Sequence, residues 1–418
     1  MRRSLPCGAK SPVRELKIGT SWVRGVVGDG LTPELVVNFA CAFGTWSDGG
    51  PIVIGRDPRR SSAMFRAAVV SGLLSPGCEI IDLGICPTPL VSFVVRETGA
   101  SGGISITGGH NDARWNALKF LGPDGALLSA VKSEELLDIY HASTFASASR
   151  FELGRVSTGR DFSDRYVELL SSSVDVEALQ RRRFRVAVDY CNGAAGPSVT
   201  KFLESLGCEV LPINETPQRE FAHAPTPTQE NMRELAGLVR HLEVDLGAAV
   251  NVDGDRLALV TAEGQPLSEE YTLPLAVRGR LLRRPGVVVT NLSTSRMVET
   301  TAAEFGQRVV RTTVGEGHVV DCGLDEGAVI AGEGSGGVGV FPTTMAFDAG
   351  LTLATILEAM ASGGQSLASL VEELPRFHNR KGGLRCSPDR VYRALQHFRS
   401  AYSGRSPNLS DGVRIDWD

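Results

Sequence analysis

Residues 102–120, GGISITGGHNDARWNALKF, hold the pattern around which the rest of the chain can be interpreted. Ile104 and Ile106 alternate with two small polar residues, as side chains do along a β-strand. Gly108 and Gly109 follow, and they permit the positive φ angles of a sharp turn. The polar and charged residues around that turn are His110, Asn111, Asp112 and Lys119. The stretch therefore predicts a strand that delivers a polar loop to a functional site.

The composition is that of a globular protein with several domains. The chain has 418 residues, too many for one hydrophobic core, and this predicts roughly two to four domains. A net charge of −5 argues against a nucleic-acid partner, which usually requires a basic face. No apolar run approaches the length of a membrane span, so we expect no membrane partner. The eight cysteines are scattered singly, which favours free thiols in the cytoplasm.

Three segments repeat one order of elements, namely a strand, a polar loop, an amphipathic helix and a second strand. They begin near Pro51, Phe184 and Gly286. Such repeats predict several similar α/β domains instead of one large sheet. Domains of this kind place their functional loops at strand ends, where a central cleft can gather them.

An acidic loop lies between two apolar segments at residues 246–260. It presents Asn251, Asp253 and Asp255 at alternate positions, so that three side chains can converge on one point. Oxygen ligands of this kind suit Mg²⁺. The alternative is a plain hairpin with solvated acids, because Asp-Gly is a common hairpin turn.

Residues 107–112 resemble the catalytic loop of the α-D-phosphohexomutase superfamily, Thr-(Ala/Gly)-Ser-His-Asn-Pro. Gly109 stands at the position of the family's phosphorylated serine. The resemblance implies active-site roles for His110 and Lys119, with Lys119 as a general acid or base beside the transferred phosphate. Taken alone, a lysine is more often a solvated cation, because burial of an amine is costly unless it is paired.

Four other segments resemble family motifs. Residues 19–25 are similar to Gly-Thr-x-Gly-Ile-Arg-Gly, which implies that Arg24 faces the phosphoserine side of the site, although a solvated loop arginine is the alternative. Asp57 matches another family position, and we expect it to act structurally at a turn or helix start. Residues 312–318 resemble a Thr-x-Val-Gly loop, and residues 221–231 resemble a proline-rich segment. We assign no chemistry to these last two.

The metal and sugar loops of the family also have counterparts. The metal loop, Asp-x-Asp-x-Asp-Arg, resembles residues 251–256, with Asn251 in place of the first aspartate. Arg256 matches the arginine of this motif, and the resemblance implies that it binds the substrate. The resemblance implies a Mg²⁺ site with one negative charge fewer and weaker affinity. The sugar loop, Gly-Glu-x-Ser-Gly-His, resembles residues 332–337. Glu333 and Ser335 match this motif and imply contacts to sugar hydroxyls, whereas Gly337 replaces the histidine.

The resemblance covers nearly the whole chain and implies three α/β domains with mixed sheets around a central cleft, followed by a truncated α+β fourth domain. The predicted boundaries are 1–150 for the catalytic-loop domain, 151–263 for the metal-loop domain, 264–374 for the sugar-loop domain and 375–418 for the partial fourth domain. The family's phosphate-binding loop is expected just beyond Asp418, where the chain stops.

By lineage the substrate is a hexose phosphate, and the reaction interconverts hexose 6-phosphate and hexose 1-phosphate. Mutase turnover is opposed by Gly109, because glycine has no oxygen that can carry a phosphoryl group. One alternative is a non-catalytic sugar-phosphate binding or regulatory protein. Another is a metal-dependent phosphatase or phosphotransferase that uses Asp253 or Asp255. The sequence gives no indication of the oligomeric state.

Overall fold

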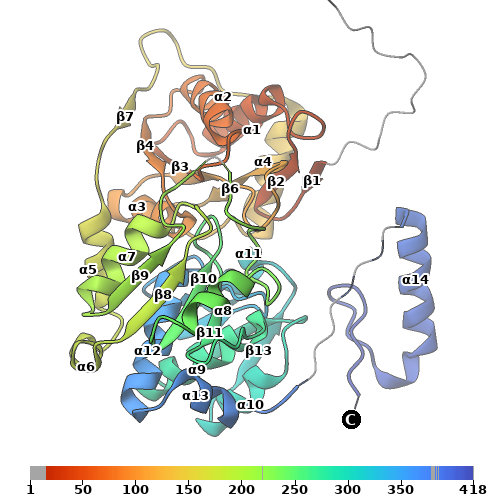
Figure 1. Ribbon diagram of the computed structural model, residues 1–418. Helices are drawn as coiled ribbons and strands as arrows, with labels where there is room; N and C mark the ends of the chain where they lie inside the picture. Colours follow the sequence, from red (N-terminus) through yellow and green to blue (C-terminus); the bar gives the residue numbers. More distant parts are fainter. Residues whose placement is uncertain (1–15, 219, 378–381, 383, 385, 418) are drawn as a thin grey trace, which may run out of the picture.

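The computed structural model describes residues 16–218, 220–377, 382, 384 and 386–417. Within these residues three α/β domains follow one another along the chain, and a helical segment comes last (Figure 1). The arrangement confirms the predicted class of three similar α/β domains with mixed sheets. In the part of the chain described here, no helix combines the length and the hydrophobicity needed to cross a membrane.

The first domain is built on a seven-stranded sheet with the order β1-β2-β6-β5-β3-β4-β7. The pairs β5–β3, β3–β4 and β4–β7 are parallel. The pairs β1–β2, β2–β6 and β6–β5 are antiparallel. Its core packs Phe39 and Phe43 of one helix against Phe120 of the sheet. The elements are β1 (Leu16–Ile18), β2 (Trp22–Val26), α1 (Pro33–Trp46), β3 (Ile52–Arg56), α2 (Ser62–Leu74), β4 (Ile80–Ile85), α3 (Thr88–Thr98), β5 (Gly102–Ile106), β6 (Trp115–Leu121), α4 (Ala130–Ala142) and β7 (Val156–Thr158).

The second and third domains each contain a four-stranded sheet, with the orders β11-β10-β8-β9 and β13-β12-β14-β15. The elements of the second domain are α5 (Ser163–Ser171), α6 (Val176–Arg182), β8 (Arg185–Asp189), α7 (Gly196–Ser205), β9 (Glu209–Ile213), α8 (Arg233–Val239), β10 (Leu246–Val250) and β11 (Leu257–Thr261). Those of the third are η1 (Glu269–Tyr271), α9 (Thr272–Arg283), β12 (Val288–Asn291), α10 (Met297–Glu304), β13 (Val309–Thr312), α11 (Glu316–Asp325), β14 (Ile330–Gly332), β15 (Val338–Val340), α12 (Ala349–Gly363) and α13 (Leu367–Glu373).

All three domains share one arrangement of four strands. Two parallel strands, β3–β4, β8–β9 or β12–β13, lie beside an antiparallel hairpin, β5–β6, β10–β11 or β14–β15. The loops that close these hairpins are residues 107–114, 251–256 and 333–337. These are the three loops that the sequence motifs single out. The repeated fold thus presents one polar loop from the same place in each domain.

The three domains pack directly on one another through a shared hydrophobic core. Val91 of α3, Leu203 of α7 and Leu353 of α12 belong to one cluster of buried side chains, although they come from three domains. Burial of apolar area is the main favourable term in such contacts. This core therefore holds the three hairpin loops at fixed positions relative to one another.

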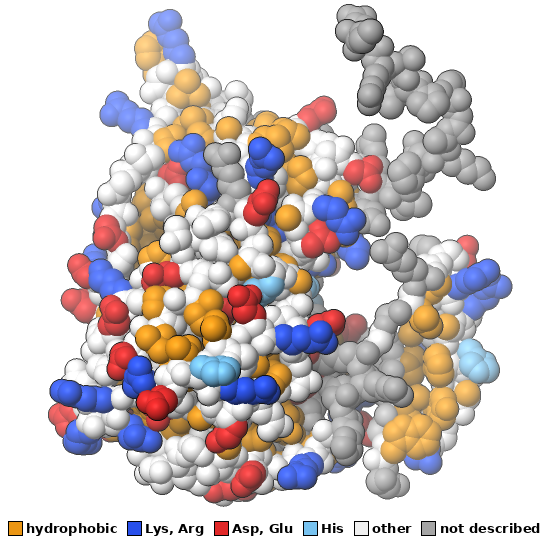
Figure 2. Space-filling view, viewed as in Figure 1, with side chains coloured by type: hydrophobic (Ala, Val, Ile, Leu, Met, Phe, Trp, Pro, Cys, Tyr) orange, Lys and Arg blue, Asp and Glu red, His pale blue; other side chains and the backbone are white. Residues whose placement is uncertain are grey.

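The last described segment lies apart from the three domains in Figure 1. It contains α14 (Pro388–Ala401), η2 (Ser403–Arg405) and an isolated bridge between Asn408 and Arg414. Hydrophobic side chains gather on the face of this segment that is turned toward the viewer in Figure 2, and Tyr392 and Phe398 of α14 are exposed. The backbone N–H of Val314 donates to Asp411 Oδ2 at 2.8 Å and connects the segment to the third domain. Residues 378–381, 383, 385 and 418 of the predicted fourth domain lie outside the described residues.

Candidate functional site

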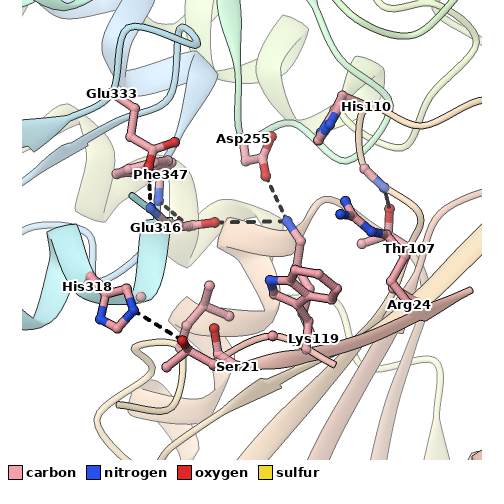
Figure 3. Close-up of a pocket in the computed structure, with 18 of the residues that line it drawn as sticks. Ser21, Arg24, Thr107, His110, Lys119, Asp255, Glu316, His318, Glu333 and Phe347 are labelled. Carbon is pink, nitrogen blue, oxygen red and sulfur yellow. Dashed lines mark hydrogen bonds and ion pairs between the residues drawn. The ribbon is translucent and has the colours of Figure 1, made fainter. Parts of the chain in front are cut away.

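A cavity of about 390 Å³ lies where the hairpin loops of the three domains converge (Figure 3). The turn before β2 and the loop before α11 complete its wall. The predicted site residues that line it are Arg24, Gly109, His110, Lys119, Asp255, Arg256 and Glu333. The other predicted site residues, Asn251, Asp253, Ser335 and Gly337, lie in the loops behind this wall. The structure therefore brings predicted residues from positions 24 to 333 into one cavity.

A buried ion pair supports the loop of residues 107–114 from below. Asp57 accepts hydrogen bonds from Arg59 Nε at 2.7 Å and from Thr107 Oγ1 at 2.7 Å. Arg59 is 1% exposed and donates to the carbonyl oxygens of Gly109 at 2.6 Å and Trp115 at 3.1 Å. A buried charge is retained when it is paired and hydrogen-bonded in this way. The structural role expected for Asp57 is thus visible, and its partner Arg59 was not singled out from the sequence.

Arg59 also explains why residue 108 is a glycine. A Cβ atom on Gly108 would lie 2.7 Å from the guanidinium carbon of Arg59 and 2.9 Å from the carbonyl oxygen of Trp115. Gly109 differs, because it has φ of +53° and its nearest neighbours to an added Cβ are the carboxylate oxygens of Asp253 at 3.7 and 3.8 Å. An added Cβ at position 109 would therefore have space, although the left-handed backbone there disfavours a side chain.

A segment of the second domain, residues 220–231, covers the loop from the side and is called the strap below. The ring of Phe221 lies 4.8 Å from the Arg59 guanidinium, and Thr226 Oγ1 donates to the carbonyl oxygen of His110 at 2.9 Å. His223 Nε2 lies 3.0 Å from Asp189 Oδ2 at the end of β8. This proline-rich segment, for which no chemistry was predicted, therefore holds the loop of the first domain against the second domain.

The acidic loop meets Lys119 at the centre of the site. Lys119 Nζ donates to Asp253 Oδ2 at 2.8 Å and to Asp255 Oδ2 at 2.7 Å. Asn251 Nδ2 donates to the other oxygen of each carboxylate, at 2.9 Å for Asp253 and 2.6 Å for Asp255. The three acidic-loop side chains converge as the alternate spacing predicts. They converge on each other and on a lysine.

Mg²⁺ requires oxygen ligands in a near-octahedral arrangement. The Asn251 amide presents its NH₂ group to the carboxylates, and Gly109 contributes no side-chain oxygen. Within the described ranges, no group of three or more His, Cys, Asp or Glu side chains is placed to hold a metal ion. The residues as arranged do not fit the metal ion that the acidic-loop resemblance implies.

Positive charge gathers on the opposite wall, where Arg24 and Arg256 lie close to each other. Arg24 stacks on the Trp22 ring at 4.3 Å, and its Nε atom is buried with no hydrogen-bond partner among the described residues. Burial and the neighbouring Arg256 lower the pKa of Arg24. Arg256 and burial also lower the pKa of His110 to about 3, so its imidazole is neutral at neutral pH. Such a wall favours an anion.

The third domain contributes acidic groups to the remaining wall. In Figure 3, Glu316 and Asp255 both point toward the Lys119 ammonium group, and Glu316 Oε2 lies 3.9 Å from Nζ. Burial raises the pKa of Glu316 to about 7, although Lys119 acts in the opposite direction. Glu333 Oε1 accepts from Asn291 Nδ2 at 2.8 Å, and Glu333 Oε2 accepts from Ser335 Oγ at 3.1 Å. Ser335 therefore contacts the predicted sugar-binding carboxylate directly.

Several residues of this wall were not recognised from the sequence. Glu316 begins α11, directly after Gly315 with its φ of +130°, and His318 Nε2 lies 3.1 Å from Thr20 Oγ1. Phe347 lies where a larger residue at position 337 would project, because a Cβ atom on Gly337 would lie 2.3 Å from its ring. The resemblance of residues 312–318 to a family loop was the signal that could have identified Glu316 and His318.

Three repeated α/β domains, each giving one polar loop to a shared cavity with an anion-favouring wall, define the architecture of the α-D-phosphohexomutases. Comparisons with known proteins agree. Family models for phosphoglucomutase/phosphomannomutase α/β/α domains I, II and III match residues 15–147, 164–264 and 257–377. The chain belongs to the phosphoglucomutase/phosphomannomutase family.

Individual relatives span nearly the whole chain. A phosphoglucomutase/phosphomannomutase of Thermococcus kodakarensis is 34% identical over 410 residues, which cover 96% of this chain and 89% of that protein. The crystal structure of a phosphoglucomutase/phosphomannomutase family protein from Burkholderia thailandensis is 25% identical with a TM-score of 0.80, and covers 95% of this chain and 87% of that one. An N-acetylphosphoglucosamine mutase of Aspergillus fumigatus, solved with GlcNAc-6P and magnesium, shares the fold at 13% identity and a TM-score of 0.53, over 87% of this chain and 77% of that one.

Proposed function

We propose that this chain binds a hexose phosphate in the cleft between its three domains and does not form a phosphoenzyme. Family membership supports the ligand class, since the named relatives are hexose-phosphate mutases. The observation that carries the second part is Gly109, which occupies the position of the family's phosphorylated serine with room for a side chain and no oxygen to attack.

The neighbouring hydroxyl groups do not replace the missing one. Thr107 Oγ1 donates to Asp57 and accepts from the backbone N–H of Gly109 at 2.9 Å, so it is committed to the loop's support. Thr20 Oγ1 lies against His318 on the third-domain side of the cavity. Loss of a catalytic nucleophile in a well-studied hydrolase lowers turnover on the order of a millionfold. We therefore expect mutase turnover to be negligible.

The charges of the cleft support one orientation of the ligand. The phosphate group would lie beside Arg24 and Arg256, since the buried Nε atom of Arg24 has no hydrogen-bond partner among the described residues. Arginine donates several N–H groups in a planar fork that matches a phosphate. The sugar hydroxyl groups would then face Glu333, whose carboxylate accepts hydrogen bonds from Ser335 and Asn291.

The seven described cysteines are all free thiols, which supports a cytoplasmic location.

The test combines binding and covalent chemistry on the full chain. Glucose 1-phosphate, glucose 6-phosphate and glucosamine 6-phosphate are each titrated by calorimetry, with unphosphorylated glucose and inorganic phosphate as control ligands. We expect at least one hexose phosphate to bind more tightly than either control. No binding by any of them would overturn the proposal.

The covalent part is tested by incubation with glucose 1,6-bisphosphate and Mg²⁺, followed by intact mass and a coupled mutase assay. We expect an unchanged mass and no turnover. A gain of one phosphoryl group would contradict the proposal, and peptide mapping would show whether Thr20 or another residue carries it. Release of inorganic phosphate would favour the phosphatase alternative instead.

A further inference from the structure

We infer that the ammonium group of Lys119 and the amide of Asn251 take the place of a divalent cation, so that the centre of this site works without a metal ion. The inference stands on the acidic loop alone. It holds whether or not the ligand is a hexose phosphate.

A metal ion at this site would need the carboxylate oxygens of Asp253 and Asp255 as ligands. Asn251 and Lys119 each donate to one oxygen of the Asp253 carboxylate, Nδ2 to Oδ1 at 2.9 Å and Nζ to Oδ2 at 2.8 Å, and Oδ2 also accepts from Thr88 Oγ1 at 3.3 Å. The Asp255 carboxylate repeats the pattern, with 2.6 Å from Asn251 and 2.7 Å from Lys119. All four oxygens thus already face a nitrogen donor. A cation that bound them would have to displace both donors.

The hydrogen bonds of Asn251 set the orientation of its amide group. Its Oδ1 accepts from the backbone N–H groups of Asp255 at 3.1 Å and Arg256 at 3.0 Å. Rotating the amide by half a turn would set its NH₂ group against these two N–H donors and its oxygen against two carboxylates. The hydrogen-bond pattern therefore fixes the orientation. The amide oxygen is turned away from the point where the carboxylates meet.

The charge of the acidic loop also disfavours a divalent cation. An aspartate at position 251 would place three carboxylates together, and such a group attracts a divalent cation. Asn251 removes one negative charge and supplies two N–H donors in its place, and Lys119 supplies one positive charge within hydrogen-bond distance of both aspartates. Arg256 Nε lies a further 3.9 Å from Asp255 Oδ1. The two remaining carboxylates are therefore compensated by the protein itself.

The burial of the acidic loop also limits the access of a metal ion to the carboxylates. The side chains of Asp253 and Asp255 are 1% and 7% exposed, and that of Lys119 is 13% exposed. A buried ion pair is held strongly against removal of one partner, because the other charge would be left unpaired. A metal ion entering this site would have to leave Lys119 with only Glu316, at 3.9 Å, as its acidic partner. The arrangement opposes that exchange. The weakened Mg²⁺ site expected from the sequence is, on this geometry, no site.

The test measures Mn²⁺ binding to the full chain by electron paramagnetic resonance of the free ion. Wild-type protein is compared with Asn251→Asp and Lys119→Met. We expect no saturable binding by the wild type at millimolar Mn²⁺. Asn251→Asp restores the third carboxylate, and Lys119→Met removes the competing ammonium group. We expect each to bind Mn²⁺ at least about tenfold more tightly than the wild type, since ligand charge sets cation affinity.

Asn408→Asp is the matched control, because it adds the same charge at an exposed position that is not part of the acidic loop. We expect its Mn²⁺ binding to equal that of the wild type. As a second measurement that needs no variant, EDTA should leave the melting temperature of the wild-type protein unchanged. Saturable Mn²⁺ binding by the wild type, or a lower melting temperature in EDTA, would overturn the inference. It would also be overturned if both variants bound Mn²⁺ no better than the wild type.

Discussion

The two sides of the loop at residues 107–114 differ in how closely they follow the phosphohexomutase pattern. Below the loop, Asp57 and Arg59 form a buried network that holds its backbone, and the strap presses on it from the second domain. On the other side, at the reaction centre, Gly109 and Asn251 stand where the family pattern has a serine and an aspartate. There Lys119 bridges the carboxylates of Asp253 and Asp255. The residues that shape this site are therefore separate from those at the positions that perform the family's reaction.

The largest effect is expected from breaking the support below the loop. Arg59→Met removes a fully buried cation and leaves Asp57 charged and unpaired, so we expect a loss of about 3–5 kcal/mol in the free energy of unfolding. Urea denaturation followed by circular dichroism measures it. Arg60→Met, at an exposed neighbouring position, should change the same free energy by less than about 0.5 kcal/mol. Equal effects of the two substitutions would show that Arg59 does not support the loop.

The next effect sharpens the functional side. Arg24→Met should weaken the binding of a hexose phosphate by roughly 10- to 100-fold, because a charge-assisted contact to phosphate contributes about 1.5–3 kcal/mol. Stability should not fall with it, since the Arg24 Nε makes no hydrogen bond in the described protein and Arg256 lies close by. Calorimetric titration and urea denaturation separate the two quantities. Arg181→Met, at an exposed site on α6, serves as the control and should leave the affinity unchanged.

A pH dependence tests the strap. Burial lowers the pKa of His223, but its hydrogen bonds to Asp189 and Cys191 outweigh this and raise the pKa to about 11, from 6.5 for an ordinary histidine. The folded protein therefore favours the imidazolium form. Its contribution to stability is complete below pH 6.5 and is lost as the pH rises toward about 11.

The variant His223→Gln isolates this contribution. Between pH 6.5 and about pH 9, the free energy of unfolding of the wild type should fall by on the order of 2 kcal/mol more than that of His223→Gln. Urea denaturation at a series of pH values measures the difference. Parallel pH profiles for the two proteins would show that the imidazolium does not hold the strap.

The smallest effect concerns the vacant position itself. Gly109→Ser should cost about 1 kcal/mol of stability, because φ is +53° at this residue and a side chain strains a left-handed backbone. Steric overlap adds little, since the nearest atoms to the new Cβ lie at 3.7 Å. Gly306→Ala is a matched control with φ of +67° and open space around it, and thermal unfolding should give a similar loss. A much larger loss for Gly109→Ser would mean that the loop has closed over the position.

Much of the fold could be predicted from the sequence. The three strand–loop–helix–strand repeats are encoded locally, by alternating hydrophobic residues and turn signals, and they reappear as three sheets with a common strand order. The hairpin loops were identifiable for the same reason, since each lies between two apolar segments. The role of Arg59 was not, because its partners are backbone oxygens of Gly109 and Trp115, which the fold brings together across about fifty residues.

The chemistry at the centre was predictable only in part. The sequence shows that Gly109 and Asn251 depart from the family pattern, but the direction of an amide group depends on which backbone N–H groups lie behind it. The contact of Lys119 with Asp253 joins residues 134 positions apart and becomes visible only in the folded chain. Glu316 lies within the family-like loop at residues 312–318, but its position opposite Lys119 depends on the start of α11 and becomes visible only in the folded chain.

One measurement tests the central claim, that the site keeps its shape for a sugar phosphate while its reaction centre has been replaced. Glucose 1,6-bisphosphate is titrated into the wild-type protein by calorimetry in EDTA and again in Mg²⁺, and the intact mass is recorded after each titration. We expect saturable binding of equal affinity in both buffers and an unchanged mass. Binding that requires Mg²⁺, or a mass increased by one phosphoryl group, would contradict it.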